Sequence, residues 1–276
     1  MLVLFDEAAR MQAQMIPTST CTDVNDIIGL VIDNIEETDQ VFKNSQMPVR
    51  VGVVTIAKLN GFSIIPNDPA DPYRHTYPNL TSIRTSASVA ALRNAVGADA
   101  VTFMTDTQAH LGVCGVAYIQ RNVCDLGYAD AVPPSPCIGA VFAPWMFNAV
   151  TVECTSGATD NFEHELGHLM GGDHDPPYAA IPSWQSYPFA FGLSLSGQFQ
   201  TVMAQQFGPG GPDPQRILYF SNPNVYFGGI ATGNASAANA IAMTNLAPGV
   251  EAFRARPEVV FANGFDAVSA CPGITY

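Results

Sequence analysis

Three of the five histidines in this 276-residue chain lie within eleven residues, at positions 164, 168 and 174. His164 and His168 are four residues apart, so a helix would place both imidazoles on one face, where they could bind the same zinc ion. Glu165 would then lie beside the ion, where a carboxylate can take a proton from water. The spacing therefore predicts a metal site with a general base next to it.

The third histidine can reach the same ion only if the helix ends before it. Gly171 supplies that end, because glycine adopts a positive φ without the steric cost that other residues carry. We therefore expect three protein ligands, His164, His168 and His174, and a fourth position that stays open to water. The competing interpretation is a helix whose histidines only satisfy hydrogen bonds, and the glycine and the third histidine count against it.

The segment 164–175 resembles the zinc signature of the metzincin proteases, and its His174-Asp175 ending resembles that of the reprolysin (adamalysin) type. This resemblance implies a methionine turn beneath the metal, for which Met203, 29 residues after His174, is the candidate. Astacins and serralysins have a tyrosine ligand two residues after that methionine, but position 205 is glutamine here. Asp175 is expected to hold the turn or to orient a ligand histidine.

Two flanking segments, 114–118 and 216–223, resemble those of bacterial peptidyl-Asp metallopeptidases and their reprolysin-like relatives. The resemblance implies a zinc endopeptidase that acts on proteins or peptides and cuts before acidic residues. Arg216 is then the candidate cation for the substrate pocket. A structural ion pair is the other interpretation of this arginine. The segment 112–118 is the candidate strand for holding an extended substrate, and an interior strand is its alternative.

The composition limits the class of protein. With 47% hydrophobic and 13% charged residues, the chain is expected to fold as one large domain or as two closely joined subdomains. A formal charge of −13 without a basic stripe argues against nucleic acid and anionic membranes as partners. The longest apolar stretch, 138–150, is too short for a membrane span and contains Pro144. We expect a monomer.

The six cysteines form an even set without a C-x-x-C pair, which favours disulfides over a thiolate metal site, and six buried thiols are the alternative. The family resemblance implies three pairs: Cys114 with Cys154, Cys124 with Cys137, and Cys21 with Cys271. Residues 1–10 do not look like a signal peptide. Segment 260–266 resembles a tail found on exported bacterial proteins. We therefore expect a secreted bacterial protein whose targeting segment and any propeptide are absent from this chain.

The expected fold class is α/β (α+β) and metzincin-like, with a twisted, mostly parallel sheet, an antiparallel edge strand, long helices and a loop-rich C-terminal subdomain. Periodicity predicts strands at 3–5, 49–57, 100–104, 112–119 and within 141–152, and helices at about 22–42, 82–96, around the histidines and at 235–254. The expected units are a catalytic subdomain (1–171), a subdomain with the third histidine and the methionine turn (172–256), and a tail (257–276).

Several other features carry less information. His75 and His110 are isolated and are interpreted as ordinary residues, and Asp68 and Asp71 are too sparse to establish a calcium site. One competing function is a non-catalytic metzincin-like zinc-binding module that captures a protein partner, but the intact Glu165 argues against it. A serine hydrolase is another, and the chain lacks its G-x-S-x-G motif.

Overall fold

A computed structural model describes residues 1–13, 27–59, 80–106, 114–122, 138–155, 161–179, 185–205 and 215–255. The described elements are, in chain order, β1 (Leu2–Phe5), α1 (Glu7–Ala13), α2 (Ile27–Asn44), β2 (Thr55–Lys58), α4 (Ala87–Ala95), β3 (Val101–Thr105), β4 (Gly115–Ala117), the 3-10 helix η2 (Gly139–Trp145), β5 (Phe147–Thr151), the 3-10 helix η3 (Val152–Cys154), α5 (Asn161–Leu169), β6 (Ser194–Leu195), β7 (Phe199–Gln200), β8 (Gln215–Arg216), β9 (Tyr226–Phe227), β10 (Ile230–Ala231) and α6 (Asn239–Glu251).

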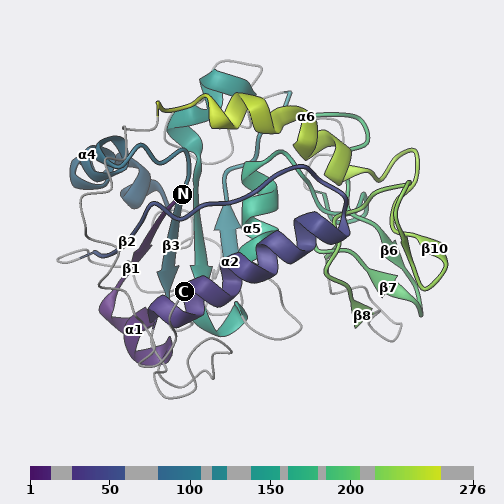
Figure 1. The fold of residues 1–276 in the computed structure, drawn as a ribbon, viewed down its shortest axis with the longest axis horizontal. Coiled ribbons are helices and arrows are strands. Elements are labelled where there is room, and N and C mark those ends of the chain that lie inside the picture. Colours follow the sequence, from purple (N-terminus) through teal and green to yellow (C-terminus); the bar gives the residue numbers. More distant parts are fainter. Residues whose placement is uncertain are drawn as a thin grey trace, which may run out of the picture.

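The first five strands form one sheet in the spatial order β2-β1-β3-β5-β4 (Figure 1). Strand β1 runs parallel to β2 and β3, and β3 runs parallel to β5, whereas the edge strand β4 is antiparallel to β5. The register pairs Val3 with Thr102, and Thr102 with Asn148, across the centre of the sheet. The predicted sheet, mostly parallel with one antiparallel edge strand, is confirmed.

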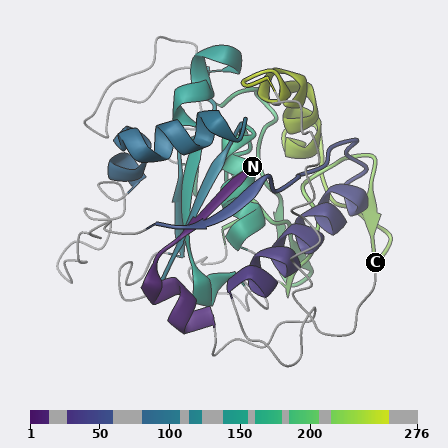
Figure 2. The same cartoon turned by 60° about the vertical axis from the view of Figure 1, so that its left-hand side comes forward.

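Helices cover both faces of this sheet. Successive strand residues point to opposite sides, and both sets of side chains are apolar, so each face packs against a helix. Leu2 and Leu4 face the side on which Val89 of α4 packs. Val3 and Phe5 face the other side, where α2 and α5 contribute to a larger hydrophobic core. Figure 2 shows the sheet between α4 on one side and α2 on the other.

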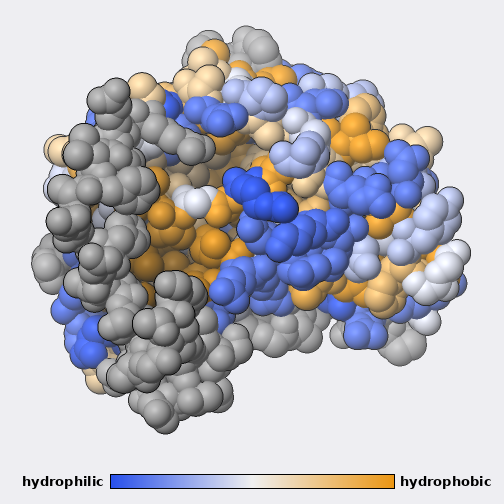
Figure 3. Space-filling model, viewed as in Figure 1, coloured by the Kyte–Doolittle hydropathy of each residue, from blue (hydrophilic) through white to orange (hydrophobic). Residues whose placement is uncertain are grey.

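Helix α2 is amphipathic, as expected for the helix that periodicity predicted at about 22–42. Leu30, Val31 and Phe42 are buried in the core, whereas Glu36 and Lys43 are exposed. In Figure 3 the exposed side of α2 contributes to a hydrophilic band across the face that is seen in Figure 1. The helix therefore forms one wall of the core and separates it from solvent.

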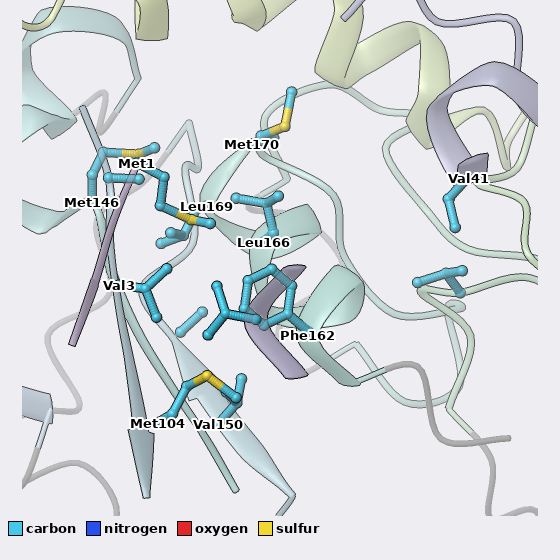
Figure 4. Close-up of a cluster of buried hydrophobic side chains, with 14 of the residues drawn as sticks. Met1, Val3, Val41, Met104, Met146, Val150, Phe162, Leu166, Leu169 and Met170 are labelled. Atoms are coloured by element: carbon cyan, nitrogen blue, oxygen red, sulfur yellow. The ribbon is translucent and has the colours of Figure 1, made fainter. Parts of the chain in front are cut away.

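The histidine-bearing helix α5 is anchored by its apolar face. Phe162, Leu166 and Leu169 are spaced by about one helical turn and are all buried. Figure 4 shows these side chains between the helix and Val3 and Val150 of the sheet. Complete burial of a side chain of this size contributes about 2 kcal/mol. The packing therefore fixes the position of the helix relative to the sheet.

The C-terminal part is built from short elements. Strands β6, β7 and β8 form a three-stranded sheet, and β9 and β10 form a hairpin. Helix α6 places Ala240 and Met243 in the same core as α5. This core draws residues from both sides of the predicted boundary near Gly171. The boundary itself stays a prediction.

The predicted strand 49–57 was too long. Pairing with β1 begins only at Thr55. Val49, Val51 and Val53 alternate as in a strand and pack against the core, but they lie outside the strand that the structure forms. Alternation of apolar residues indicates a half-buried extended segment, and pairing needs a matching neighbour as well.

The predicted helix 82–96 is interrupted at Ser86. Residues 80–85 are helical, Ser86 is extended with φ −67° and ψ 121°, and α4 begins directly after it. The Ser86 hydroxyl accepts a hydrogen bond from the Val89 amide at 3.4 Å and so caps α4. A serine within a helical pattern can compete for backbone groups in this way, and apolar periodicity does not register it.

Some predictions lie outside the described residues. These are the beginning of the helix predicted at about 22–42, the disulfides Cys124–Cys137 and Cys21–Cys271, residues His75, His110, Asp68 and Asp71, and the tail 257–276. Among the helices that are described, none combines the length and the apolar character that crossing a bilayer requires.

Cys114 and Cys154 form a disulfide, as the family resemblance implied. The bridge links the residue before β4 to the last residue of η3, which precedes α5. Because the cross-linked residues are 40 positions apart, the bridge removes much conformational freedom from the unfolded chain.

We expect the paired substitution Cys114→Ser and Cys154→Ser to lower the free energy of unfolding by about 4 kcal/mol, the chain-entropy value for a loop of this length. Denaturant unfolding of both proteins measures the difference. The paired substitution is preferable to a reductant, because the chain has four other cysteines. Equal unfolding free energies would show that the bridge does not stabilise the fold.

Candidate metal centre

Helix α5 presents three sets of side chains in three directions. Within each set the residues are about one helical turn apart. Its apolar face meets the sheet. His164 faces Val202 of the C-terminal part, and His168 faces Gly172 in the turn directly after the helix. Asn161 and Glu165 lie against Gly115 of β4. The helix thus places the histidines and the glutamate on neighbouring faces, as the sequence spacing predicted.

His174 joins the two helical histidines. Its Nε2 lies 3.0 Å from Nε2 of His164 and 3.1 Å from Nε2 of His168. All three candidate ligand atoms lie within 4.8 Å of one another. Nitrogens that bind one tetrahedral zinc ion at 2.0–2.1 Å are about 3.3 Å apart. The separations therefore match a single metal ion with three imidazole ligands.

The other ring nitrogens determine where the protons are. Each Nδ1 lies near a backbone carbonyl oxygen: His164 near Val202 at 2.8 Å, His168 near Gly172 at 2.9 Å and His174 near Tyr178 at 3.3 Å. A carbonyl oxygen only accepts, so each Nδ1 carries the proton and each Nε2 of a neutral ring has a free lone pair. Lone pairs that converge at 3.0–3.1 Å cannot hydrogen-bond to each other. A shared cation satisfies all three, so the donor set fits a zinc ion.

Burial keeps these imidazoles neutral. It lowers the pKa of His164 well below its usual value, and the neighbouring His168 and His174 lower it further. The pKa of His168 falls to about 3, mainly through burial and then through the charge of His174. The pKa of His174 is also lowered by burial, against the opposing charge of Asp173. The candidate ligands are therefore deprotonated at neutral pH, as metal binding requires.

Gly171 ends the helix as expected. Its φ is +90°, its amide bonds to the His168 carbonyl at 2.9 Å, and the Gly172 amide bonds to the Gly167 carbonyl at 2.9 Å. These contacts satisfy carbonyls at the end of α5 and turn the chain toward His174. Without this turn the third histidine would continue away from the first two.

Met203, the candidate for the methionine turn, lies in a turn of the chain. The Ala204 amide bonds to the Thr201 carbonyl at 2.9 Å, and Met203 is fully buried within the turn. A side chain added at Gly167 would collide with the Met203 sulfur, so the methionine lies directly against the helix between the two histidines. Val202 beside it supplies the carbonyl for His164.

Asp175 contacts the methionine turn and not a histidine ring. Its carboxylate accepts a hydrogen bond from the Gln205 amide at 2.9 Å, and its backbone carbonyl accepts from Tyr178 at 2.9 Å. It therefore ties the loop of the third histidine to the segment that follows Met203. Of the two roles expected for it, holding the turn is the one that these contacts support.

Glu165 is 4% exposed, and its Oε2 has no hydrogen-bond partner among the described residues. Burial raises its pKa to about 8, while Asn161 and the positive charge of Arg216 oppose that rise. Arg216 lies in β8, is partly exposed and donates to the Ala204 carbonyl at 3.1 Å. The predicted pocket cation therefore lies close enough to Glu165 to influence it.

Gly115 allows the edge strand to approach the glutamate. A Cβ at this position would collide with the Asn161 side-chain amide and would lie 2.7 Å from Cγ of Glu165. Only glycine fits between the strand and the helix here, since Cβ contacts below 3.0 Å essentially never occur. The sequence contained this glycine within a recognised segment, but its contact with Glu165 requires the tertiary fold.

Asn161 and Asp173 also belong to the site, and the histidine motif did not indicate a role for either residue. Asn161 lies four residues before Glu165, and this helical spacing could have indicated it. Asp173 is 1% exposed and receives a hydrogen bond from the His174 amide at 2.8 Å. Its charged partner, Arg121, is 52 residues away in the sequence. No local pattern connects that pair.

This arrangement is typical of metal-dependent hydrolases. It combines a buried helix that carries two histidines, a third histidine after a glycine turn, and a turn with a buried methionine. The family model for metallo-peptidase family M12B, Reprolysin-like, matches residues 31–175, slightly more than half of the chain. The protein therefore belongs to the reprolysin-like metallopeptidase family.

Similarity to individual proteins is more limited in length. A "Peptidyl-Asp metalloendopeptidase" of Xanthomonas campestris pv. campestris is 35% identical over 109 residues, which are 39% of this chain and 25% of the relative. The protein of that name in Stenotrophomonas maltophilia is 34% identical over 113 residues, 39% of this chain and 26% of the relative. The chain thus spans about a quarter of the length of the curated relatives that it matches.

A solved structure described as "Structure of a chaperone-substrate complex" has a similar fold. Its TM-score is 0.61 with 16% identity, and the match covers 92% of this chain and 34% of that chain. At this identity the similarity concerns the fold alone.

We expect the metal-free protein to lose stability as the pH falls below 6.5. Unfolded His168 takes up a proton there, whereas the folded residue, with a pKa of about 3, does not. Between pH 7 and 5 the free energy of unfolding should fall less steeply in His168→Gln than in the wild type, by about 1 kcal/mol per pH unit on average. Equal slopes in the two proteins would contradict a depressed pKa for this histidine.

Gly115→Ala should slow peptide cleavage by about tenfold to a hundredfold, because the added methyl group must displace Glu165 or Asn161. Gly52→Ala is the matched control, since a Cβ there meets nothing within 4 Å. Cleavage rates of both folded variants test this. A Gly115→Ala protein as active as the Gly52→Ala protein would argue against the close approach.

Proposed function

We propose that this protein is a zinc-dependent endopeptidase in which His164, His168 and His174 hold one zinc ion and Glu165 is the general base. The observation that carries the proposal is the convergence of three Nε2 lone pairs next to the buried Glu165 carboxylate, whose Oε2 has no hydrogen-bond partner in the described part of the chain. A non-catalytic module that captures a partner would not need that carboxylate. Membership of a metallopeptidase family supports the same choice.

When bound, zinc supplies a Lewis acid that lowers the pKa of water and polarises a carbonyl group. Glu165 accepts a proton from the attacking water through Oε2 and delivers it to the departing amine. In the metal-free protein burial raises its pKa to about 8. The positive charge of a bound zinc ion would lower this pKa, so that the group begins as the carboxylate that a general base needs. Asn161 and Gly115 limit where the carboxylate can lie.

The edge strand β4 is the proposed binding site for the peptide backbone. It is the last strand of the sheet order, so one of its edges has no strand neighbour among the described residues. Gly115 places this strand against Glu165. An extended peptide that adds to a sheet edge gains backbone hydrogen bonds. The substrate would then run past the catalytic glutamate.

We also propose a preference for cleavage before acidic residues, with Arg216 as the cation of the pocket. The relatives are named for a peptidyl-Asp activity. Arg216 is partly exposed, and its charge acts on Glu165 and His164. A guanidinium group in that place would pair with a carboxylate after the scissile bond.

The proposed location is outside the cytoplasm of a bacterium. The Cys114–Cys154 disulfide supports an oxidising compartment, and the named relatives are bacterial.

Cleavage of a proteome-derived peptide library, mapped by mass spectrometry, tests the function. Glu165→Gln should lower the rate by about 10²- to 10⁴-fold, because the amide cannot accept the proton, while bound zinc is retained. Arg216→Met should reduce cleavage before acidic residues relative to cleavage at other bonds. Undiminished cleavage by Glu165→Gln would refute the mechanism. An unchanged cleavage pattern in Arg216→Met would refute only the role of the pocket cation.

A further inference from the structure

His174 needs external support that the other two histidines do not. His164 and His168 are held by α5, which is anchored in the core, whereas His174 lies beyond the end of that helix. The Nε2 of His174 must nevertheless stay within about 3 Å of both other rings. The residue directly before it, Asp173, is the centre of the contacts that hold this loop.

The Asp173 backbone is fixed on both sides. Its amide donates to the Ala190 carbonyl at 2.8 Å, and its carbonyl accepts from the Gly192 amide at 3.0 Å. One side-chain oxygen, Oδ1, accepts from the His174 amide at 2.8 Å. The carboxylate is therefore connected directly to the backbone of the third histidine.

The second oxygen, Oδ2, is held by two donors. Arg121 donates to it at 3.2 Å, and the Gln185 side-chain amide donates at 3.2 Å. The Arg121 and Asp173 side chains are 9% and 2% exposed, so this is a buried ion pair. A buried pair is hardly screened by solvent, and the loss of one partner leaves an uncompensated charge.

Arg121 is itself placed by its neighbours. Gln120 donates to the Leu169 carbonyl at the end of α5 at 2.8 Å and accepts from the Gly139 amide at 3.1 Å. Asn122 donates to the Gln185 carbonyl at 2.8 Å. Three consecutive residues shortly after β4 thus bind the end of the helix, the Asp173 carboxylate and the segment at Gln185. This connected set, residues 120–122 with Asp173 and Gln185, is called the histidine clamp below.

We propose that the Arg121–Asp173 ion pair is a positioning device for His174, through which the histidine clamp sets how tightly zinc is held. The inference rests on the proposed function, in which His174 is a zinc ligand. The pair is joined to the ligand through a hydrogen bond from the His174 backbone amide. Among the described residues, the ring nitrogen Nδ1 of His174 bonds instead to the Tyr178 carbonyl. Outer partners of metal ligands commonly change metal affinity by about 10- to 100-fold when they are removed.

The test compares the zinc dissociation constant and the zinc release rate of folded variants by competition with a chromophoric chelator. Arg121→Met should weaken zinc binding by about 10- to 100-fold. Arg121→Lys should recover part of that loss, because an ammonium group can still pair with Asp173. The double variant Arg121→Met with Asp173→Asn should lose no more zinc affinity than the single variant that binds zinc more weakly, since the two residues act as one unit.

Arg93→Met is the matched control. Arg93 is also buried, at 2% exposed, but it binds the carbonyls of Ala98 and Ala143 and stacks on Phe147. Its removal should lower the melting temperature and leave zinc affinity unchanged. The KM of zinc-saturated Arg121→Met should remain within about twofold of the wild-type KM, because the pair positions a metal ligand and not the substrate.

A folded Arg121→Met protein with wild-type zinc affinity would overturn the inference, and so would an equal loss of affinity in Arg93→Met. If Arg121→Met does not fold, Asp173→Asn applies the same criterion, since it keeps the shape of the side chain and removes its charge. Failure of the proposed function has a different result. In that case the wild-type protein itself would bind no zinc, or His174→Gln would bind it as tightly as wild type.

Discussion

The orientation of three imidazole rings by three backbone carbonyls is the constraint on which the rest of this site depends. Val202, Gly172 and Tyr178 each accept from an Nδ1, so all three Nε2 lone pairs point to one place. These carbonyls belong to the methionine turn, the end of the helix and the loop after His174. The site forms only if all three backbone segments are placed together, which requires most of the fold.

Helix α5 links this constraint to the core. Its apolar face packs against the sheet, its histidines meet the C-terminal segment and its glutamate meets β4. Small residues make the close approaches possible, with Gly167 against Met203 and Gly115 against Glu165. The position of the helix is thus fixed by hydrophobic burial, and the steric fit of two glycines decides how close the functional groups come.

Polar contacts take over where hydrophobic packing ends. The loop of His174 is held by the hydrogen bonds of Asp173, Asp175 and their partners. Asp175 connects it to the methionine turn, and Asp173 connects it to the chain beyond β4. Buried carboxylates with defined donors give such a loop a single arrangement, because each donor fixes a direction as well as a distance.

The sequence by itself determined the chemistry of the site and the class of the fold. The spacing of His164, Glu165 and His168 and the glycine before His174 are local patterns that helical geometry converts directly into positions. Alternating strands and helices likewise predicted a mostly parallel sheet. The length of β2, the break at Ser86 and the contact of Gly115 with Glu165 were decided by the tertiary structure. So was the pairing of Arg121 with Asp173, whose partners are 52 residues apart. Each of these depends on which distant segment becomes a neighbour, and periodicity within one segment carries no information about that.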